Sequence, residues 1–381
     1  MNTEVMKLKR SQLESIAEHR ERLRKNPHLR WLFFEITSKC NLNCMHCGSN
    51  CTYSGQSLTV EDVERTLRTV ENEKPMICLT GGEPMLHPLF FDIAGAVRDM
   101  GFFWGMTTNA TLIDEESARK LREAGMSTVS VSLDGMERAH DSLRRQNSAW
   151  RRALRGLKAL QEAGVRPQVT TVVHRENFDD LEPLYELLCE MGITSWRPIN
   201  IEPIGRACES GSLQLLPEQF AELIAYIRDK RFDRNCNMEV TFGCSHYLGV
   251  ENERMVRDHY FLCGAGILTA SVRSNGDICA CLDIVNRQDL VQGNIRTDNF
   301  RDVWLNRFEA FRRDRTADCA KCVSCADRFI CGGDSTHTWD FENNKPMLCY
   351  KDLMVPGTIN LQDYTTGRLN TSGRRTILLP D

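Results

Sequence analysis

The sequence predicts an α/β protein whose parallel sheet, open or curled into a partial barrel, precedes a small domain held together by bound metal. Between residues 31 and 201, short apolar runs alternate with helical patterns, and such repeats are typical of parallel strands joined by helices. The chain also has 17 cysteines, most of which gather at residues 40–51 and 263–349. In a chain without an export signal, gathered cysteines more often bind metal than form disulfides.

The regular elements of the predicted sheet follow one another along the chain. We expect strands at residues 31–37, 76–80, 102–108, 128–133, 168–173 and 195–201, and helices at 59–72, 89–100, 114–123, 149–163, 180–191 and 217–231. Parallel sheets bind their ligands at the carboxyl ends of the strands. Several motifs fall at such ends, so we expect them to share one site: the cysteine loop, residues 81–84, residues 107–109 and residues 132–135.

The remaining segments complete the domain organisation. Residues 1–30 are expected to form a short charged helix on the surface, 31–235 the sheet region, 236–355 the metal-held domain and 356–381 a loosely ordered tail. Short strands are expected at 268–273 and 277–281. We expect the second domain to have little apolar core, so bound clusters would have to hold it together.

Composition excludes several classes of protein. With 48 basic and 52 acidic residues the net charge is −4, which gives no general attraction to nucleic acid or to an anionic membrane. No apolar run approaches the roughly 20 residues that cross a bilayer. The first 30 residues lack the continuous apolar stretch of a signal peptide. We therefore expect a cytoplasmic protein with neither a nucleic acid nor a membrane as its partner.

The first cysteine group has the spacing Cys40-x3-Cys44-x2-Cys47. Three thiolates can hold three irons of a [4Fe–4S] cluster and leave the fourth iron open to another ligand, whereas structural clusters usually have four cysteines. Cys51 could supply the fourth thiolate, which is the main alternative. Zinc sites prefer paired C-x2-C units, so zinc fits this group less well.

This spacing, directly after a first strand, resembles the radical S-adenosylmethionine (SAM) superfamily over residues 31–205. The resemblance implies a partial (β/α)6 TIM-like barrel. It also implies that a cluster on Cys40, Cys44 and Cys47 binds SAM and cleaves it reductively. The resulting 5′-deoxyadenosyl radical would abstract hydrogen from a substrate.

The same resemblance implies further cofactor-binding positions. His46 stands where the family usually has an aromatic residue against the adenine, although it could be a surface loop histidine. Ser132 and Arg144 would bind the SAM carboxylate, with a surface arginine as the alternative for Arg144. Asn109 would contact ribose or carboxylate. The motif that would contact the methionyl amine comprises Gly81, Gly82, Glu83 and Pro84.

The second cysteine group resembles the SPASM extension of radical SAM enzymes, which holds two auxiliary iron–sulfur clusters. Its spacing is Cys263-x12-Gly276-x4-Cys281, then Cys319-x2-Cys322-x2-Cys325-x5-Cys331, with Cys349 after 17 more residues. The resemblance implies that one auxiliary cluster uses a late set of thiols: Cys322, Cys325, Cys331 and Cys349.

The other auxiliary cluster is less well defined, because Ser335 stands where the family has a cysteine. We expect it to use Cys263 and Cys281 with either Cys319 or Cys279. The site could be incomplete, hold a [2Fe–2S] cluster or leave an open iron. A single auxiliary cluster with several idle thiols is the alternative. The isolated cysteines are expected to be small buried apolar residues: Cys78, Cys189, Cys208, Cys236 and Cys244.

SPASM relatives mostly act on peptides or proteins, which favours the maturation of a ribosomal peptide or protein by crosslinking or residue oxidation. A dehydrogenase or oxidase of a small molecule or tetrapyrrole is the second interpretation, slightly favoured by Ser335. A non-catalytic iron–sulfur electron carrier is the third, although a carrier has no use for a SAM pocket. Asp283 is the candidate base, with a simple turn carboxylate as its alternative. Expected partners are the peptide or protein substrate, a flavodoxin or ferredoxin as electron donor, and a separate leader-binding protein if the enzyme's own surface does not bind the leader.

Overall fold

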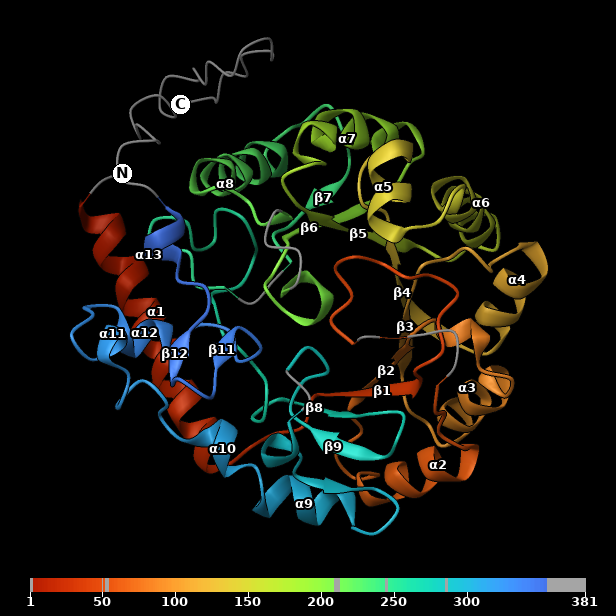
Figure 1. The fold of residues 1–381 in the computed structure, drawn as a ribbon, viewed down its shortest axis with the longest axis horizontal. Coiled ribbons are helices and arrows are strands. Elements are labelled where there is room, and N and C mark those ends of the chain that lie inside the picture. The colour runs from red at the N-terminus through yellow and green to blue at the C-terminus, as the bar shows by residue number, and fades with distance from the viewer. Residues whose placement is uncertain are drawn as a thin grey trace.

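One curled sheet of ten strands surrounds the centre of the molecule, and helices cover its outside (Figure 1). This arrangement is seen in a computed structural model that describes residues 3–49, 51, 55–208, 213–243, 246–284 and 287–354. Within these residues the strand order is β10-β9-β8-β1-β2-β3-β4-β5-β6-β7. All neighbours from β8 through β7 run parallel, while β9 and β10 are antiparallel to their neighbours.

Each of the six predicted barrel strands is present, which confirms the α/β fold. They are β1 (Trp31–Thr37), β2 (Met76–Gly81), β3 (Trp104–Thr108), β4 (Met126–Ser132), β5 (Pro167–Val173) and β6 (Ser195–Asn200). Their buried side chains, such as Phe34, Leu79 and Val131, join one apolar core between the sheet and the helices. Burying such a side chain fully contributes about 1.5–3 kcal/mol.

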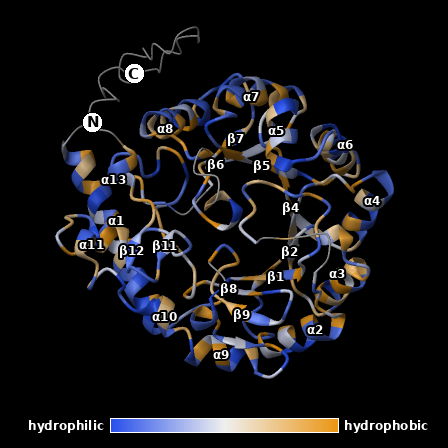
Figure 2. Cartoon of the chain, in the orientation of Figure 1, coloured by the Kyte–Doolittle hydropathy of each residue, from blue (hydrophilic) through white to orange (hydrophobic). Residues whose placement is uncertain are grey.

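The predicted outer helices are also present. They are α2 (Val60–Thr69), α3 (Phe90–Asp99), α4 (Glu115–Glu123), α6 (Ala149–Glu162), α7 (Leu181–Glu190) and α8 (Pro217–Arg231). Helix α2 begins at a capping box in which the Thr59 side chain accepts from the Asp62 N–H and Asp62 accepts from the Thr59 N–H. Figure 2 shows hydrophobic and hydrophilic residues interleaved along these helices, as expected for helices with one face on a core. Short 3-10 helices follow some strands: η1 (Pro84–Leu86), η2 (Phe178–Asp180), η3 (Gly205–Cys208) and η5 (Gln288–Leu290).

Helix α5 (Glu137–Arg144) was not predicted. Its sequence is mostly polar, but His140, Leu143 and Arg144 are all buried. Its C-cap, Arg145, has a φ of 51°, which ends the helix before α6 begins. The helix therefore places two ionisable side chains inside the protein beside the carboxyl end of β4.

The C-terminal region extends the barrel sheet at both edges. Strand β8 (Thr269–Val272) pairs in parallel with β1, with Phe34 opposite Val272, and β9 (Asp277–Cys279) and β10 (Gly293–Asn294) follow it. Strand β7 (Glu239–Val240) lies at the other edge, beside β6. The short strands predicted at 268–273 and 277–281 thus correspond to β8 and β9, while the predicted boundary at residue 235 remains a prediction.

The expectation that the C-terminal region has little apolar core is wrong. Phe300, Trp304, Phe308 and Phe311 are buried in the main apolar core. The region contains α9 (Phe300–Asn306), α10 (Glu309–Arg312), α11 (Ala320–Val323), α12 (Arg328–Cys331), α13 (Tyr350–Leu353), β11 (Trp339–Asp340) and β12 (Lys345–Pro346). The tail predicted at 356–381 lies outside the described residues.

Helix α1 (Thr3–Lys25) is not a simple surface helix, although it was expected to be one. Leu13, Ala17 and Leu23 are buried along one face. The buried Arg20 donates from Nη1 to the Ile330 carbonyl oxygen at 2.9 Å, which ties α1 to α12. Figure 1 shows α12 lying alongside α1. None of the described helices is both long and apolar enough to cross a bilayer.

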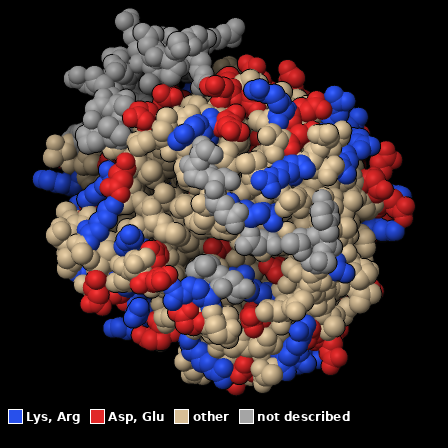
Figure 3. Space-filling model, viewed as in Figure 1, with Lys and Arg blue, Asp and Glu red and all other residues tan. Residues whose placement is uncertain are grey.

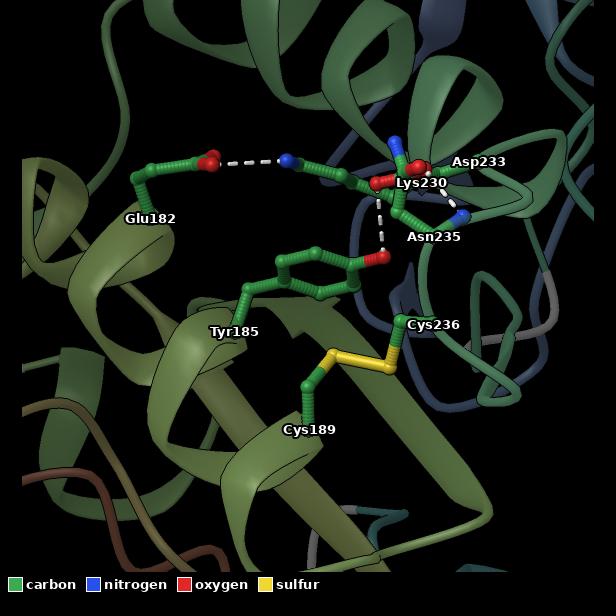
Figure 4. The surroundings of a disulfide bond; sticks show 7 residues. All are labelled: Glu182, Tyr185, Cys189, Lys230, Asp233, Asn235 and Cys236. Atoms are coloured by element: carbon green, nitrogen blue, oxygen red, sulfur yellow. Dashed lines mark hydrogen bonds and ion pairs between the residues drawn. A yellow bond between two sulfur atoms is a disulfide. The ribbon is translucent and has the colours of Figure 1, made fainter.

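Cys189 and Cys236 form a disulfide, so the prediction that both are isolated apolar residues is wrong (Figure 4). The bond joins α7 to the segment between α8 and β7. Next to it, Lys230 pairs with Glu182 at 2.7 Å and lies over the Tyr185 ring, 4.1 Å from its centroid. These contacts hold the sheet edge formed by β6 and β7.

Candidate functional site

The thiols of Cys40, Cys44 and Cys47 lie together in the loop that follows β1. Cys40 and Cys44 are buried, and the side chains of Cys51 and Leu42 pack against them. Burial raises the pKa of the Cys40 thiol to about 11. Among the described residues, no three His, Cys, Asp or Glu side chains are close enough to hold a single metal ion. Three thiols in one loop match the protein ligands of an iron–sulfur cluster, which is held by cysteine thiolates.

A fourth thiol, that of Cys51, lies beside the triad. It is buried and hydrogen-bonded to Cys47, and this bond lowers the pKa of Cys47 to about 5 while raising that of Cys51. The same loop therefore supplies both the three expected ligands and the alternative fourth one. Cys51 stays the alternative ligand for the iron that would otherwise be open.

The segment after β6 holds the cysteine loop, and the sequence analysis missed it. Arg206 donates from Nε to the Cys44 carbonyl oxygen at 2.8 Å and from Nη1 to that of Cys51 at 3.1 Å. The neighbouring Gly205 has a φ of +52°, and a Cβ there would lie 2.2 Å from the Cys47 oxygen. Only glycine allows this approach.

The end of β2 holds the loop from another side. A Cβ on Gly81 would lie 2.3 Å from the Thr37 oxygen, and one on Gly82 would lie 2.1 Å from the Lys39 oxygen. The Gly82 N–H donates to Thr37 at 2.8 Å. These glycines were expected to let the backbone approach a ligand. In the structure they let it approach the loop that carries Cys40.

Glu83 is buried, and its carboxylate joins the ends of β2 and β3. It accepts hydrogen bonds from Thr108 Oγ1 at 2.7 Å and from the Asn109 N–H at 2.8 Å. Burial raises the pKa of Glu83 to about 6, against the effect of these hydrogen bonds. Asn109 in turn donates to Asn41 Oδ1 at 3.0 Å. Glu83 and Asn109 thus help to position the cysteine loop. Pro84, the residue after Glu83, begins η1.

Arg144 is buried rather than on the surface. Its Nε donates to Asp134 Oδ2 at 2.7 Å, and its Nη1 lies 3.8 Å from Cys44 Sγ. Asp134 is fully buried; burial alone would raise its pKa, but Arg144 and nearby histidines hold it well below its usual range. Ser132, at the end of β4, is half-buried. A fixed positive charge therefore lies at the triad.

His46 is enclosed by protein and is not a simple surface residue. Its Nδ1 is buried without a hydrogen-bond partner among the described residues. Burial lowers the pKa of His46 to about 3, against the opposing effect of Asp134. The ring is therefore neutral and presents an unused polar atom next to Cys47.

Asp283 faces the cysteine loop from the C-terminal region. A Cβ on Gly48 would lie 3.3 Å from Asp283 Oδ1, and Cys281 Sγ lies 3.9 Å from Oδ2. The side chain is accessible to water, yet burial raises the pKa of Asp283, as expected for a carboxyl group in an enclosed hollow. Figure 3 shows a hollow near the centre of this face, with acidic atoms on its floor.

The C-terminal thiols fall into two groups. Cys319 is hydrogen-bonded to Cys322, and the nearby thiols of Cys325 and Cys349 help to raise the pKa of Cys322. Cys349 likewise helps to raise the pKa of Cys331, so these two thiols also lie near each other. Cys319 thus lies beside Cys322 of the late group, while its assignment together with Cys263 and Cys281 stays a prediction. The late group has thiols enough for one cluster.

Cys263 and Cys281 form the other group. Cys263 Sγ lies 3.3 Å from Thr336 Oγ1, and Cys281 is hydrogen-bonded to His337. Cys279 is buried beside Arg273 and Glu35, and burial raises its pKa to about 12.

A buried polar network next to these thiols was also missed. Glu202 Oε1 lies 2.7 Å from His246 Nε2, and Glu202 Oε2 lies 2.7 Å from His337 Nε2. His246 Nδ1 lies 2.8 Å from Asp334 Oδ2. No local motif joins these residues, because they come from distant parts of the chain.

Two family models match the chain. Residues 34–188 match the radical SAM superfamily, and residues 263–326 match SPASM, an iron-sulfur cluster-binding domain.

Several curated proteins align with most of the chain. An AdoMet-dependent heme synthase of Oleidesulfovibrio alaskensis is 28% identical over 330 residues, covering 81% of this chain and 83% of the relative. Another, from Methanosarcina barkeri, is 29% identical over 345 residues, covering 84% and 97%. The mycofactocin maturase MftC of Mycolicibacterium smegmatis is 28% identical over 308 residues, covering 79% and 76%.

Solved structures share the fold. The anSMEcpe structure with bound AdoMet has a TM-score of 0.68 at 20% identity, covering 85% of this chain and 95% of that one. Streptococcus suis SuiB bound to S-adenosylmethionine also has a TM-score of 0.68, at 19% identity, covering 84% and 76%.

Proposed function

Because this chain is a radical SAM enzyme that carries a SPASM domain, we propose that it uses SAM-derived radical chemistry to oxidise a side chain of a tetrapyrrole. The observation that carries this substrate class is the alignment with two heme synthases over more than four-fifths of the chain. Heme is an iron tetrapyrrole, so a heme precursor is the natural substrate class.

The residues around the triad would bind and orient SAM. When bound, the cluster supplies the electron that cleaves SAM and so provides the radical that abstracts hydrogen. Arg144 would hold the SAM carboxylate beside Cys44, with Ser132 as a second donor, while Asp134 keeps the guanidinium in place. His46 would pack against the adenine, and its unpartnered Nδ1 supports a ligand there.

The β2 and β3 ends would complete the SAM pocket. Glu83 would accept a hydrogen bond from the methionyl ammonium of SAM, although its two carboxylate oxygens already accept hydrogen bonds from Thr108 and Asn109. Asn109 would contact the ribose or the carboxylate of SAM. Cys40 and Cys44 are buried, which helps to keep water away from the site, as a radical reaction requires.

After the hydrogen atom is abstracted, the second electron of the oxidation would pass to an iron–sulfur cluster on the C-terminal thiols, and Asp283 would accept the proton that leaves the substrate. Asp283 is exposed to solvent and lies near both the cysteine loop, at Gly48, and Cys281. That position lies between the SAM-binding side and the C-terminal thiols. A flavodoxin or ferredoxin would supply electrons in the cytoplasm.

A peptide or protein substrate is the second candidate, and the alignment with MftC over 79% of the chain favours it. In that case a leader peptide would bind to the enzyme's own surface or to a separate partner protein. A non-catalytic electron carrier is disfavoured by the buried Arg144 at the triad, which has no role in electron storage.

Anaerobic assays with SAM and dithionite test this function. We expect iron coproporphyrin III, an iron tetrapyrrole with carboxyethyl side chains, to increase 5′-deoxyadenosine formation and to change in mass. The triple variant C40A/C44A/C47A should produce neither. If the tetrapyrrole stays unchanged while a peptide encoded beside the gene loses mass on coexpression, the second candidate replaces the first.

A further inference from the structure

The segment 335–337 lies against two of the C-terminal thiols, those of Cys263 and Cys281. Ser335 is fully buried, and the next residue, Thr336, donates from its N–H to Cys263 Sγ at 3.4 Å. His337 is hydrogen-bonded to Cys281. This segment therefore brings successive side chains to Cys263 and Cys281, although the cysteine expected at 335 is absent.

The hydrogen bond between His337 and Cys281 is compatible with a metal bound by both side chains. A thiolate sulfur and an imidazole nitrogen at about 2.3 and 2.1 Å from one tetrahedral metal lie about 3.6 Å apart. This separation is also that of a hydrogen bond to sulfur. His337 also lies close enough to Cys263 to help lower the pKa of that thiol. One imidazole thus lies near both thiols.

The other side of the His337 ring is held as a metal-binding histidine usually is. Its Nε2 lies 2.7 Å from Glu202 Oε2, and both side chains are only 9% exposed. Metal-ligating histidines almost always engage a carboxylate or carbonyl with their second nitrogen, which fixes the ring. Glu202 is fixed in turn by His246, which also bonds Asp334.

The other candidates for a third ligand are placed less well. Cys319 lies with Cys322 in the late group of thiols. Cys279 lies near Cys281 but is buried beside Arg273 and Glu35, and no hydrogen bond between Cys279 and Cys281 is seen among the described residues. His337 alone of these residues bonds Cys281 directly.

We propose that His337 is a ligand of the first auxiliary iron–sulfur cluster, together with Cys263 and Cys281, and that Glu202 is its positioning residue. The imidazole takes the place of the cysteine missing at Ser335. Mixed histidine and cysteine ligation is known for iron–sulfur centres and raises their reduction potential. This assignment does not depend on whether the substrate is a tetrapyrrole or a peptide.

Pulsed EPR of the full chain tests the assignment. The C40A/C44A/C47A background removes the SAM-binding cluster, and the late cysteine cluster has no nitrogen ligand. After anaerobic reconstitution and reduction, we expect the hyperfine coupling of a directly bound nitrogen, which changes isotope on ¹⁵N-histidine labelling. H337C should keep the iron but lose this coupling. H246A, which alters the same Glu202 network without removing the ligand, should keep the coupling.

Glu202 has its own readout. E202Q should keep the iron and the nitrogen coupling but shift the midpoint potential of this cluster, because the hydrogen bond to a bound imidazole loses its charge. An unchanged potential would assign Glu202 a merely structural role. The absence of histidine coupling in the background protein, or its persistence in H337C, would overturn the ligand assignment.

Discussion

The disulfide between Cys189 and Cys236 joins α7 to the segment that leads into β7, and its contribution to stability follows from the loop that it closes. Its cysteines are separated by 47 positions in the sequence. Restricting the unfolded chain by a loop of that length stabilises the native state by about 4 kcal/mol in the chain-entropy relation. An unfolding entropy of about 2.1 cal/mol/K per residue over 381 residues converts this into a melting temperature about 5 °C lower for C189S/C236S.

The assay compares apparent melting temperatures at one scan rate, under anaerobic conditions, with and without a thiol reductant. Reductant should lower the wild-type value to that of C189S/C236S and leave the variant unchanged. C208S is the matched control, because Cys208 is exposed and outside the disulfide. Thiol titration of the unfolded protein should find two fewer thiols in the wild type without reductant. Equal melting temperatures for wild type and C189S/C236S, without reductant, would refute the reasoning.

Three further predictions concern the site. G205A should lose iron from the triad and 5′-deoxyadenosine formation, because its Cβ would meet the Cys47 oxygen at 2.2 Å; G192A, with a similar φ but nothing within 4 Å of the added atom, should keep both. Burial raises the pKa of Glu83 from 4.5 to about 6 in the folded protein. As pH rises through this range, ionisation of Glu83 should therefore lower the free energy of unfolding by about 2 kcal/mol. Chemical unfolding of E83Q at the same pH values should not show this decrease. D283N should still cleave SAM but form oxidised product at least about 10²-fold more slowly, seen as 5′-deoxyadenosine without product; an unchanged product rate would exclude Asp283 as the base.

Local patterns explain why most of the barrel could be predicted. Each buried strand is a short apolar run with turn residues at its ends, and these signals lie within a few residues of each other. Pairing between β1 and β8 depends on segments more than 200 residues apart, such as Phe34 and Val272, and no local signal reports it. Helix α5 was missed because its inward face uses His140 and Arg144, whose burial depends on Asp134 and the cysteine loop.

The same contrast applies to the site. The triad was found because its thiols follow one another in a single loop. Arg206 could not be found, because it acts through backbone oxygens of that loop and needs the loop to lie against η3. Glu202 and His337 meet only when the end of β6 reaches the C-terminal region. Polar residues whose partners are distant in sequence leave no spacing to recognise.

An open iron can persist only if the three thiols cannot rearrange to admit another ligand, and the contacts around the loop supply that restraint. Gly82 fixes the loop from β2, Arg144 from α5 and Arg206 from η3, so the loop is held by three separate elements of the barrel. The same contacts also fix Cys51, because its thiol is hydrogen-bonded to Cys47 and its carbonyl oxygen accepts a hydrogen bond from Arg206. A C51A variant should therefore keep the triad iron and SAM cleavage if the fourth iron is open. Loss of the iron in C51A, measured by Mössbauer spectroscopy, would mean that Cys51 occupies the position at which SAM has to bind.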